Sequence, residues 1–265
     1  MAVDLERGIA SDDANVAAMI GAFGLMIGRL PGATADRSDG VATSFGHVPL
    51  AFFNMSILDR PMTDPVDFRA ALDVACARAR ACSYSSFVSL CHAWAPDGAD
   101  KIIAEAGLLP ALSVTGMAAD QLFAARRPAP DLEYRLAGSP GVAEDLGLIN
   151  ALAYGMPPED FGCVAEPNLW RGQSFGVVGY VDGRAVSSTA AFVVGEDIYV
   201  AYVATLPEAY GRGYAEAVMR RAIVLAQDAI GARRIWLHAT EMGRPLYQSM
   251  GFETGATLPL YTLAS

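Results

Sequence analysis

Apolar residues in the second half of the chain follow two periods, one typical of strands and one typical of helices. Strands are expected at Phe175–Val181 and Ala185–Val194, joined by Asp182-Gly183, which is a hairpin turn signal. A third strand, rich in Val and Tyr, covers Ile198–Thr205, and a helix with an apolar stripe covers Gly213–Ile230. The other elements expected here are strands at Leu132–Leu136, Arg234–Ala239 and Phe252–Tyr261, and helices at Gly141–Tyr154 and Arg244–Met250.

The first half of the chain predicts a comparable order of elements. Asp12–Leu30 is expected to be a helix with Ser11 as its N-cap. Asp64 and Pro65 are typical of a helix start, and the helix that they open runs to about Ala81. The other elements expected in this half are strands at Val48–Leu58, Phe87–Trp94 and Leu108–Met117, and a short helix at Ala99–Ala106.

A proline-bearing stretch separates the two halves. Pro128 and Pro130 favour extended backbone and break the helical periodicity. The expected domains are therefore residues 1–127 and 131–265, each close to the usual size of a domain. The alternation of helices and strands predicts an α/β protein with a mixed α+β sheet.

Composition and charge narrow the classes of function. The chain has 265 residues, of which 53% are hydrophobic and 18% charged, so it is too apolar to be disordered. The net charge of -10 and the pI near 4.7 argue against binding to nucleic acid or anionic membranes. Ala14–Gly28 is too short to span a bilayer, and the acidic Met1–Gly8 is not a signal peptide. We expect a soluble cytoplasmic protein.

The four cysteines form neither a disulfide framework nor a metal motif. Cys76, Cys82, Cys91 and Cys163 include no CxxC pair, so reduced core thiols are expected. Cys91 and His92 are adjacent potential ligands without further partners, which is a poor metal motif. The sequence therefore predicts no metal site.

The most informative residues lie in a strand-to-helix turn of the second half. Gly211 and Gly213 stand between the strand that ends at Thr205 and the helix that follows. Backbone N–H groups at a helix start have no intrahelical partner, and the helix dipole adds positive charge, so such a turn can hold phosphate. Glycines let a ligand approach the backbone, and Arg212 adds a cation for an anionic oxygen. Taken alone, the two glycines also fit an ordinary turn and cap.

The wider pattern over residues 131–265 resembles the GCN5-related N-acetyltransferase (GNAT) family. Tyr210–Ala215 is similar to the family's acetyl-CoA signature, Gln/Arg-x-x-Gly-x-Gly/Ala, except that Tyr210 replaces Gln or Arg. Leu246–Phe252 looks like the family's Leu-Tyr-x-x-x-Gly-Phe ending. The resemblance implies the acyl-CoA N-acyltransferase fold and transfer of the acetyl group of acetyl-CoA to an amine. The residues that it assigns to acetyl-CoA are Val203, Ala204, Thr205, Tyr210, Gly211, Arg212, Gly213, Tyr214, Ala215 and Glu216.

The resemblance also implies how the chemistry is divided. Amine attack on the thioester builds negative charge on oxygen, and the backbone of Val203–Thr205 is expected to stabilise it. Tyr247 matches the position of the family's tyrosine that protonates the departing thiolate. The alternative is that Tyr247 is an aromatic residue of the core with its hydroxyl at the surface.

The general base that neutralises the amine is the least defined part of the site. The strand Ile198–Thr205 contains no carboxylate, so the candidates lie around it. His238 lies in the next strand, Glu241 follows that strand, and Glu196 and Asp197 stand at the entrance of this one. A hydrogen-bonded structural His238 and a solvated Glu196 are the alternatives.

The first half shows no glycine-rich phosphate loop. We expect a diverged, cofactor-free copy of the same fold, which could cover the substrate face of the second half or mediate a homodimer. Two other functions stay open. One is a non-catalytic acyl-CoA-binding or regulatory module, and the other is a structural partner in which both halves serve assembly.

Overall fold

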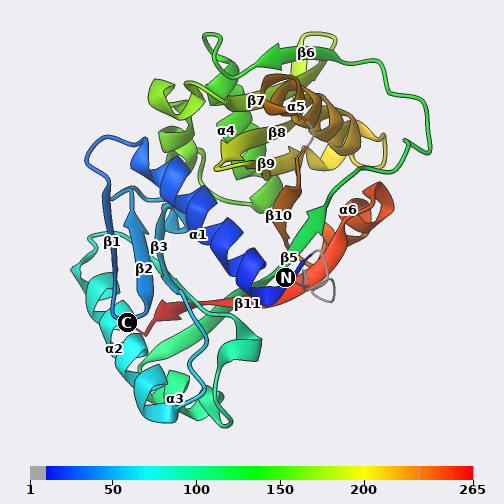
Figure 1. Cartoon of the computed structure of the whole chain (residues 1–265). Helices are drawn as coiled ribbons and strands as arrows, with labels where there is room; N and C mark the ends of the chain where they lie inside the picture. The colour runs from blue at the N-terminus through cyan, green and yellow to red at the C-terminus, as the bar shows by residue number, and fades with distance from the viewer. Residues whose placement is uncertain (1–9, 232, 265) are drawn as a thin grey trace. The chain divides into compact units, whose positions relative to one another are not determined.

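The computed structural model describes residues 10–231 and 233–264 (Figure 1). It divides into two compact units. The N-terminal unit holds the chain up to Ala119, His238–Gln248 and the residues from Phe252 on, and the C-terminal unit holds Asp120–Leu237 and Ser249–Gly251. These units differ from domains 1–127 and 131–265, because the end of the chain joins the N-terminal unit.

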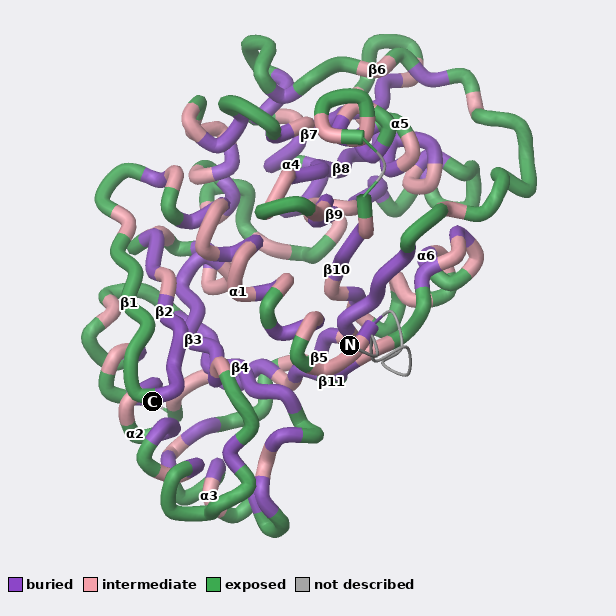
Figure 2. The backbone as a smooth tube through the Cα atoms, viewed as in Figure 1, coloured by how far each residue is buried: buried purple, intermediate pink, exposed green. Residues whose placement is uncertain are grey.

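The N-terminal unit is a mixed sheet with helices on both faces. Its strands follow the order β1, β2, β3, β4, β11, β5. β3 is buried at every position, which requires cover on both faces, and α1 and α2 both pack on it (Figure 2). The elements up to β5 are α1 (Asp12–Gly28), β1 (Thr34–Ser38), β2 (Val41–Phe45), β3 (Asn54–Leu58), α2 (Pro65–Ala81), β4 (Phe87–Ser89), α3 (Ala99–Glu105) and β5 (Leu108–Ala119).

The last strand of the chain, β11 (Glu253–Leu263), completes this sheet. It lies between β4 and β5 and pairs antiparallel with both, and its ladder with β5 runs from Glu253↔Ala118 to Leu263↔Leu108. Strands so distant in sequence pair through their tertiary context, so local periodicity could not place β11 in this unit.

The C-terminal unit repeats the arrangement of two helices on a mixed sheet. Its strands follow the order β10, β9, β8, β7, β6, and α4 and α5 both pack on β8, whose middle is buried. Its elements are β6 (Glu133–Leu136), α4 (Val142–Tyr154), β7 (Ser174–Val181), β8 (Arg184–Val194), β9 (Asp197–Thr205), α5 (Tyr214–Ile230) and the start of β10 (Ile235–Ala239). The last helix, α6 (Arg244–Met250), begins in the N-terminal unit.

The elements expected in the second half begin and end within two residues of those observed. In the first half, the strand expected at Val48–Leu58 starts only at Asn54, after a 3₁₀ turn, and the strand expected at Phe87–Trp94 ends at Ser89. The hairpin of β1 and β2 was missed, although Asp39-Gly40 is a turn signal of the same kind as Asp182-Gly183. All five β1 residues are exposed, so the strand lacks the alternation that marks a half-buried one.

None of the helices in the described ranges combines the length and the hydrophobicity that a membrane crossing requires.

Candidate functional site

The edge of β9 separates from its parallel neighbour within the C-terminal unit. β9 pairs with β10 at Ile235↔Ile198 and Trp236↔Tyr199, close to the start of both strands. β9 then continues to Thr205 along β8. Within the described residues, the β10-side edge of β9 beyond Tyr199 has no strand partner in this unit, so its peptide groups are available to a ligand.

A β-bulge lies in this free part of β9. In the ladder with β8, the pair Ala190↔Ala201 is followed by Ser188↔Ala204. Tyr202 and Val203 therefore lie together opposite the single β8 residue between Ser188 and Ala190. Tyr202 has φ +55°, a conformation that costs a bulky residue about 1–2 kcal/mol. Its ring packs against both Trp170 and Phe192, with centroids 6.3 and 6.2 Å away, and those two rings stack on each other at 6.0 Å. The fold therefore maintains the bulge against a local cost.

Polar side chains of β8 and α4 hold the carbonyl groups of the bulge. Ser187 Oγ donates to Ala204 O at 2.9 Å, and Ser188 Oγ donates to Tyr202 O at 3.2 Å. The buried Asn150 donates from Nδ2 to Ser188 Oγ at 3.0 Å and to Tyr202 O at 3.4 Å. These contacts fix the backbone direction where strand pairing is interrupted.

A second tyrosine touches the same backbone. Tyr154, at the end of α4, donates from its hydroxyl to Val203 O at 3.3 Å. Tyr154 and Tyr210 are 47% and 49% exposed, so both present aromatic surface to solvent. Sequence reasoning missed Asn150, Tyr154 and the β8 hydroxyls, although three consecutive hydroxyl residues, 187–189, inside an apolar strand were a usable signal.

The turn after β9 leaves the start of α5 open. Gly211 and Gly213 have φ +74° and +79°, which glycine adopts without strain. Gly213 is the N-cap, and among the described residues no side chain caps the N–H groups of the first turn. A Cβ placed on either glycine would meet no atom within 4 Å, so the space above the turn is open. Backbone donors, helix dipole and open space together suit a diphosphate.

The side chains around this turn differ in what they can do. Arg212 is exposed and free to reach an anionic oxygen, with no contact described for its side chain. Glu216 is engaged, since Arg220 lies 2.8 Å from its carboxylate and also donates to Phe123 O. The predicted role of Glu216 therefore rests on its backbone N–H group alone.

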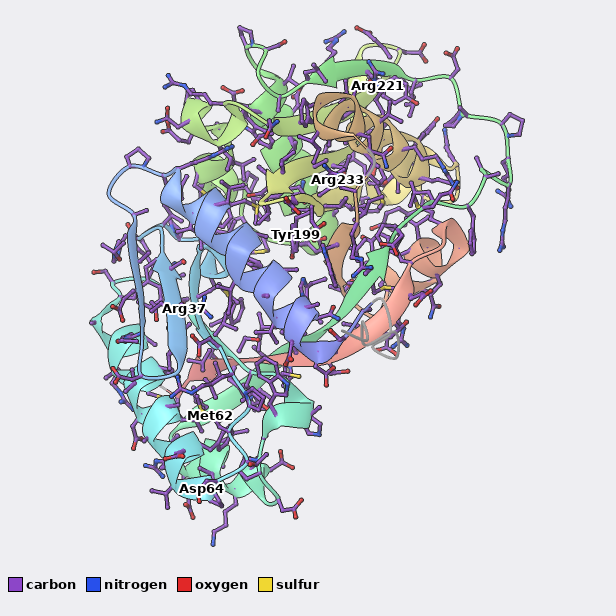
Figure 3. All side chains as sticks on the ribbon, in the orientation of Figure 1. Arg37, Met62, Asp64, Tyr199, Arg221 and Arg233 are labelled. Atoms are coloured by element: carbon purple, nitrogen blue, oxygen red, sulfur yellow. The ribbon has the colours of Figure 1, made fainter. Side chains whose placement is uncertain are left out.

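The corresponding helix of the N-terminal unit is closed. α2, like α5, has 17 residues and connects two parallel strands, here β3 and β4. Asp64, which is labelled in Figure 3, caps this helix. Its carboxylate accepts from Val66 N at 2.7 Å and from Asp67 N at 3.2 Å. β3 also stays paired with β4 from Met55↔Phe87 to Ile57↔Ser89. At the place that corresponds to the start of α5, the N-terminal unit therefore has a capped helix start beside a paired strand.

Two of the predicted catalytic residues, Tyr247 and His238, belong to the N-terminal unit. Tyr247 is 8% exposed, lies edge-on to Phe252 with centroids 6.0 Å apart, and packs against Gly243. Burial lowers the pKa of His238 to about 4, and a hydrogen bond to the backbone of Asn15 offsets this only in part. His238 is therefore neutral at neutral pH and a weak base.

Glu196 lies at the far end of β9 from the bulge. It is exposed in the turn between β8 and β9, seven residues before Val203, which corresponds to roughly 20 Å of strand. Its neighbour Asp197 accepts a hydrogen bond from Trp236 Nε1 at 2.9 Å. Neither carboxylate lies at the end of the strand where the turn and bulge are found, so we do not carry Glu196 into the mechanism.

Comparison with known proteins agrees with this geometry. Residues 149–252 match the model of the acetyltransferase (GNAT) family. The C-terminal half of the chain therefore contains a GNAT domain, as the sequence motifs predicted. The match covers β9, the glycine turn and α5. No curated protein sequence matches the chain.

Solved structures resemble the chain over nearly its whole length. A GCN5-related N-acetyltransferase from Kribbella flavida has a TM-score of 0.67 at 19% identity, over 94% of this chain and 96% of that one. One from Sphaerobacter thermophilus has a TM-score of 0.57 at 15% identity, over 96% and 93%. A tandem GNAT protein from the clavulanic acid biosynthesis pathway has a TM-score of 0.54 at 12% identity, over 95% of both chains. The likeness establishes a two-part GNAT fold.

Proposed function

We propose that the C-terminal half binds acetyl-CoA and transfers its acetyl group to an amine. The N–H groups around Gly211–Glu216 hold the diphosphate, with Arg212 as an added cation. The pantetheine chain pairs with the free edge of β9 along Val203–Thr205, as an additional strand would. Acetyl-CoA supplies the activated thioester.

The observation that carries the proposal is that an open helix start and an unpaired strand edge occur together. β9 is followed by a 3₁₀ turn at Pro207–Ala209 and then by the Gly211–Gly213 turn, so one segment of the chain offers donors to both the diphosphate and the pantetheine amides. In the N-terminal unit, the helix at the corresponding place is capped by Asp64, and the strand before it is paired with β4.

The chain's part in the chemistry follows from the bulge and from two side chains. A backbone N–H at the bulge stabilises the negative charge that develops on the thioester oxygen. Tyr247 donates its phenolic proton to the departing sulfur, an assignment that rests on its place in the motif. Because His238 is a weak base, we propose that water takes the proton of the attacking ammonium.

An acidic protein favours a cationic acceptor. With a net charge of -10, the chain attracts amines that are protonated in solution. We therefore propose a small or protein-borne amine as the acceptor class, without choosing between them.

One observation favours a second candidate, a non-catalytic acyl-CoA-binding module. Among the predicted bases, His238 has a pKa near 4, and Glu196 lies at the opposite end of β9 from the bulge. A protein with the cofactor site but no effective base would bind acetyl-CoA and not transfer its acetyl group.

Two measurements test these proposals in turn. Titration calorimetry with acetyl-CoA first tests binding, and absence of binding would reject both candidates. Thiol release over a panel of amines then tests transfer, and binding without release would favour the non-catalytic module.

Tyr247→Phe tests the proton donor. We expect turnover to fall at least tenfold with little change in acetyl-CoA affinity. Tyr261→Phe is the matched control, because Tyr261 is also 8% exposed and lies in the same unit. Equal turnover in the two variants would remove Tyr247 from the mechanism.

A further inference from the structure

A cavity of about 370 Å³ opens within the N-terminal unit, beside α1. It lies between α1, the end of β1, the segment that follows β3, and the 3₁₀ turn at His92–Trp94. Its volume is in the range of small-molecule sites. No sequence motif pointed to it, because its residues come from four separated segments.

One wall of the cavity is apolar. Val16 and Ile20 line it from a single stripe of α1, since residues four apart on a helix share a face. Trp94 adds an aromatic surface, and its backbone is fixed by hydrogen bonds to Cys91 O at 3.0 Å and from Met62 N at 3.1 Å. This wall is rigid and suits the flat or branched body of a small molecule.

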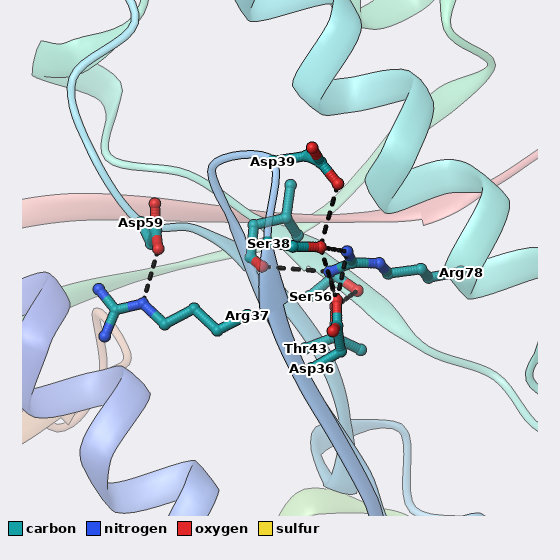
Figure 4. Close-up of polar contacts among 9 residues, drawn as sticks. Asp36, Arg37, Ser38, Asp39, Thr43, Ser56, Asp59 and Arg78 are labelled. Atoms are coloured by element: carbon teal, nitrogen blue, oxygen red, sulfur yellow. Dashed lines mark hydrogen bonds and ion pairs between the residues drawn. The ribbon is translucent and has the colours of Figure 1, made fainter.

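The facing wall carries two guanidinium groups around one carboxylate. Asp59 is only 10% exposed, and Arg37 Nε donates to it at 2.7 Å (Figure 4). Arg60 lies 3.9 Å from the same carboxylate. The two arginine side chains are 64% and 62% exposed, so most of their N–H donors face solvent or the cavity. This cluster therefore has one positive charge in excess of its carboxylate.

A second carboxylate, Asp13, lines the cavity from the first turn of α1. At that position it complements the positive end of the helix dipole. The Asp13 carboxylate balances the excess charge of the arginine cluster, so the lining as a whole is neutral. A carboxylate ligand would be held by the exposed N–H donors of Arg37 and Arg60.

The cavity cannot be a second acetyl-CoA site of the kind proposed above. Asp64 already occupies the first N–H groups of α2, and β3 and β4 remain paired. We propose that this cavity binds a small carboxylate with an apolar body, whose carboxylate is held by Arg37 and Arg60 and whose body packs on Val16, Ile20 and Trp94. This inference is independent of acetyl transfer.

The test is a titration of the full chain with three probes of one size and different charge. Benzoate, benzamide and benzylamine share a phenyl ring and differ in carrying a negative, neutral or positive group. Calorimetry is expected to give benzoate at least tenfold tighter binding than either analogue. No benzoate binding at millimolar concentration, or a preference for benzamide or benzylamine, would overturn the proposal.

Two variants locate the probe. Arg60→Gln removes one exposed cation, and Ala17→Phe places a ring into the cavity from an exposed position on α1. Each is expected to weaken benzoate binding at least tenfold, whereas Arg80→Gln, an exposed arginine of α2 outside the cavity, leaves it unchanged. Melting temperatures check that the variants fold. Benzoate binding that neither Arg60→Gln nor Ala17→Phe weakens would place the site elsewhere and refute the assignment.

Discussion

Gly213→Asp would place a carboxylate at the start of α5, where α2 has that of Asp64. In α2 the Asp64 carboxylate satisfies the N–H groups of Val66 and Asp67. At the same place in α5 stands Gly213, whose side-chain position opens onto free space. An aspartate there would add a negative charge beside the donors that we assign to the diphosphate.

The charge should affect binding far more than folding. A unit charge about 4 Å from a phosphate oxygen costs about 4 kcal/mol at an effective dielectric constant of ~20. Allowing for screening by salt, acetyl-CoA should bind roughly 10² to 10³ times more weakly. For folding, the main cost is about 1–2 kcal/mol of strain at φ +79°, because residue 213 lacks the extended backbone with which Asp64 caps α2. The loss of stability should therefore be smaller than the loss of binding free energy.

Calorimetry with acetyl-CoA at low and high salt separates charge from shape. Gly213→Asn has nearly the same shape without the charge, so it should bind more tightly than Gly213→Asp, and the gap should shrink as salt rises. Gly183→Asp is the control for strain, because Gly183 has φ +76° and equally open space in the β7–β8 turn. If Gly213→Asp and Gly183→Asp bound acetyl-CoA as tightly as the unaltered protein, the diphosphate would not lie on this turn.

Three further changes test other parts of the structure. Asp64→Ala should lower the free energy of unfolding by about 1 kcal/mol through loss of the α2 cap and leave acetyl-CoA affinity unchanged; reduced affinity in calorimetry would contradict a closed helix start. Asn150→Ala removes donors to Ser188 and Tyr202, so denaturant unfolding should show a free energy of unfolding that is lower by about 1–3 kcal/mol. The kcat/KM for acetyl-CoA should fall as well. Full activity in a destabilised variant would show that the bulge needs no support. The pKa of His238 is near 4 in the folded protein and 6.5 for the free side chain, so the unfolded chain takes up the proton first as the pH falls. The free energy of unfolding should therefore decrease as the pH drops from about 6.5 to 4. The pH dependence of unfolding should be flatter in His238→Gln, and identical curves would refute the burial argument.

The sequence was most informative where a local rule has a strong physical cause. The turns at Asp182-Gly183 and Gly211–Gly213 were found because positive φ values favour glycine and its small polar neighbours. The helix at Pro65–Ala81 was found from its start, since Asp64 both caps it and precedes a proline. These features need no knowledge of distant contacts.

The features that were missed depend on tertiary contacts. The bulge at Tyr202 is held by Asn150, which lies 52 positions earlier in the chain, so no window around β9 reveals it. The membership of β11 in the N-terminal unit depends on pairing with β5. The cavity beside α1 exists only once its four segments are assembled. Local periodicity predicts elements, whereas these sites arise from their assembly.

The two helix starts also show why one substitution should not create a second cofactor site. Asp64→Gly would remove the carboxylate that closes the start of α2. If this carboxylate were the only obstacle, the N-terminal unit of the variant would bind acetyl-CoA. A diphosphate on a helix start is only part of the ligand, however, because the pantetheine chain needs an unpaired strand edge beside it. β3 stays paired with β4 as far as Ile57↔Ser89, one residue before β3 ends at Leu58. β9, in contrast, extends six residues beyond Tyr199, which forms its last described pair with β10. Separating β3 from β4 would break ladder hydrogen bonds in a fully buried strand, each costing about 1–3 kcal/mol when left unpaired. We therefore expect that Asp64→Gly alone would not create acetyl-CoA binding in the N-terminal unit, because β3 and β4 remain paired.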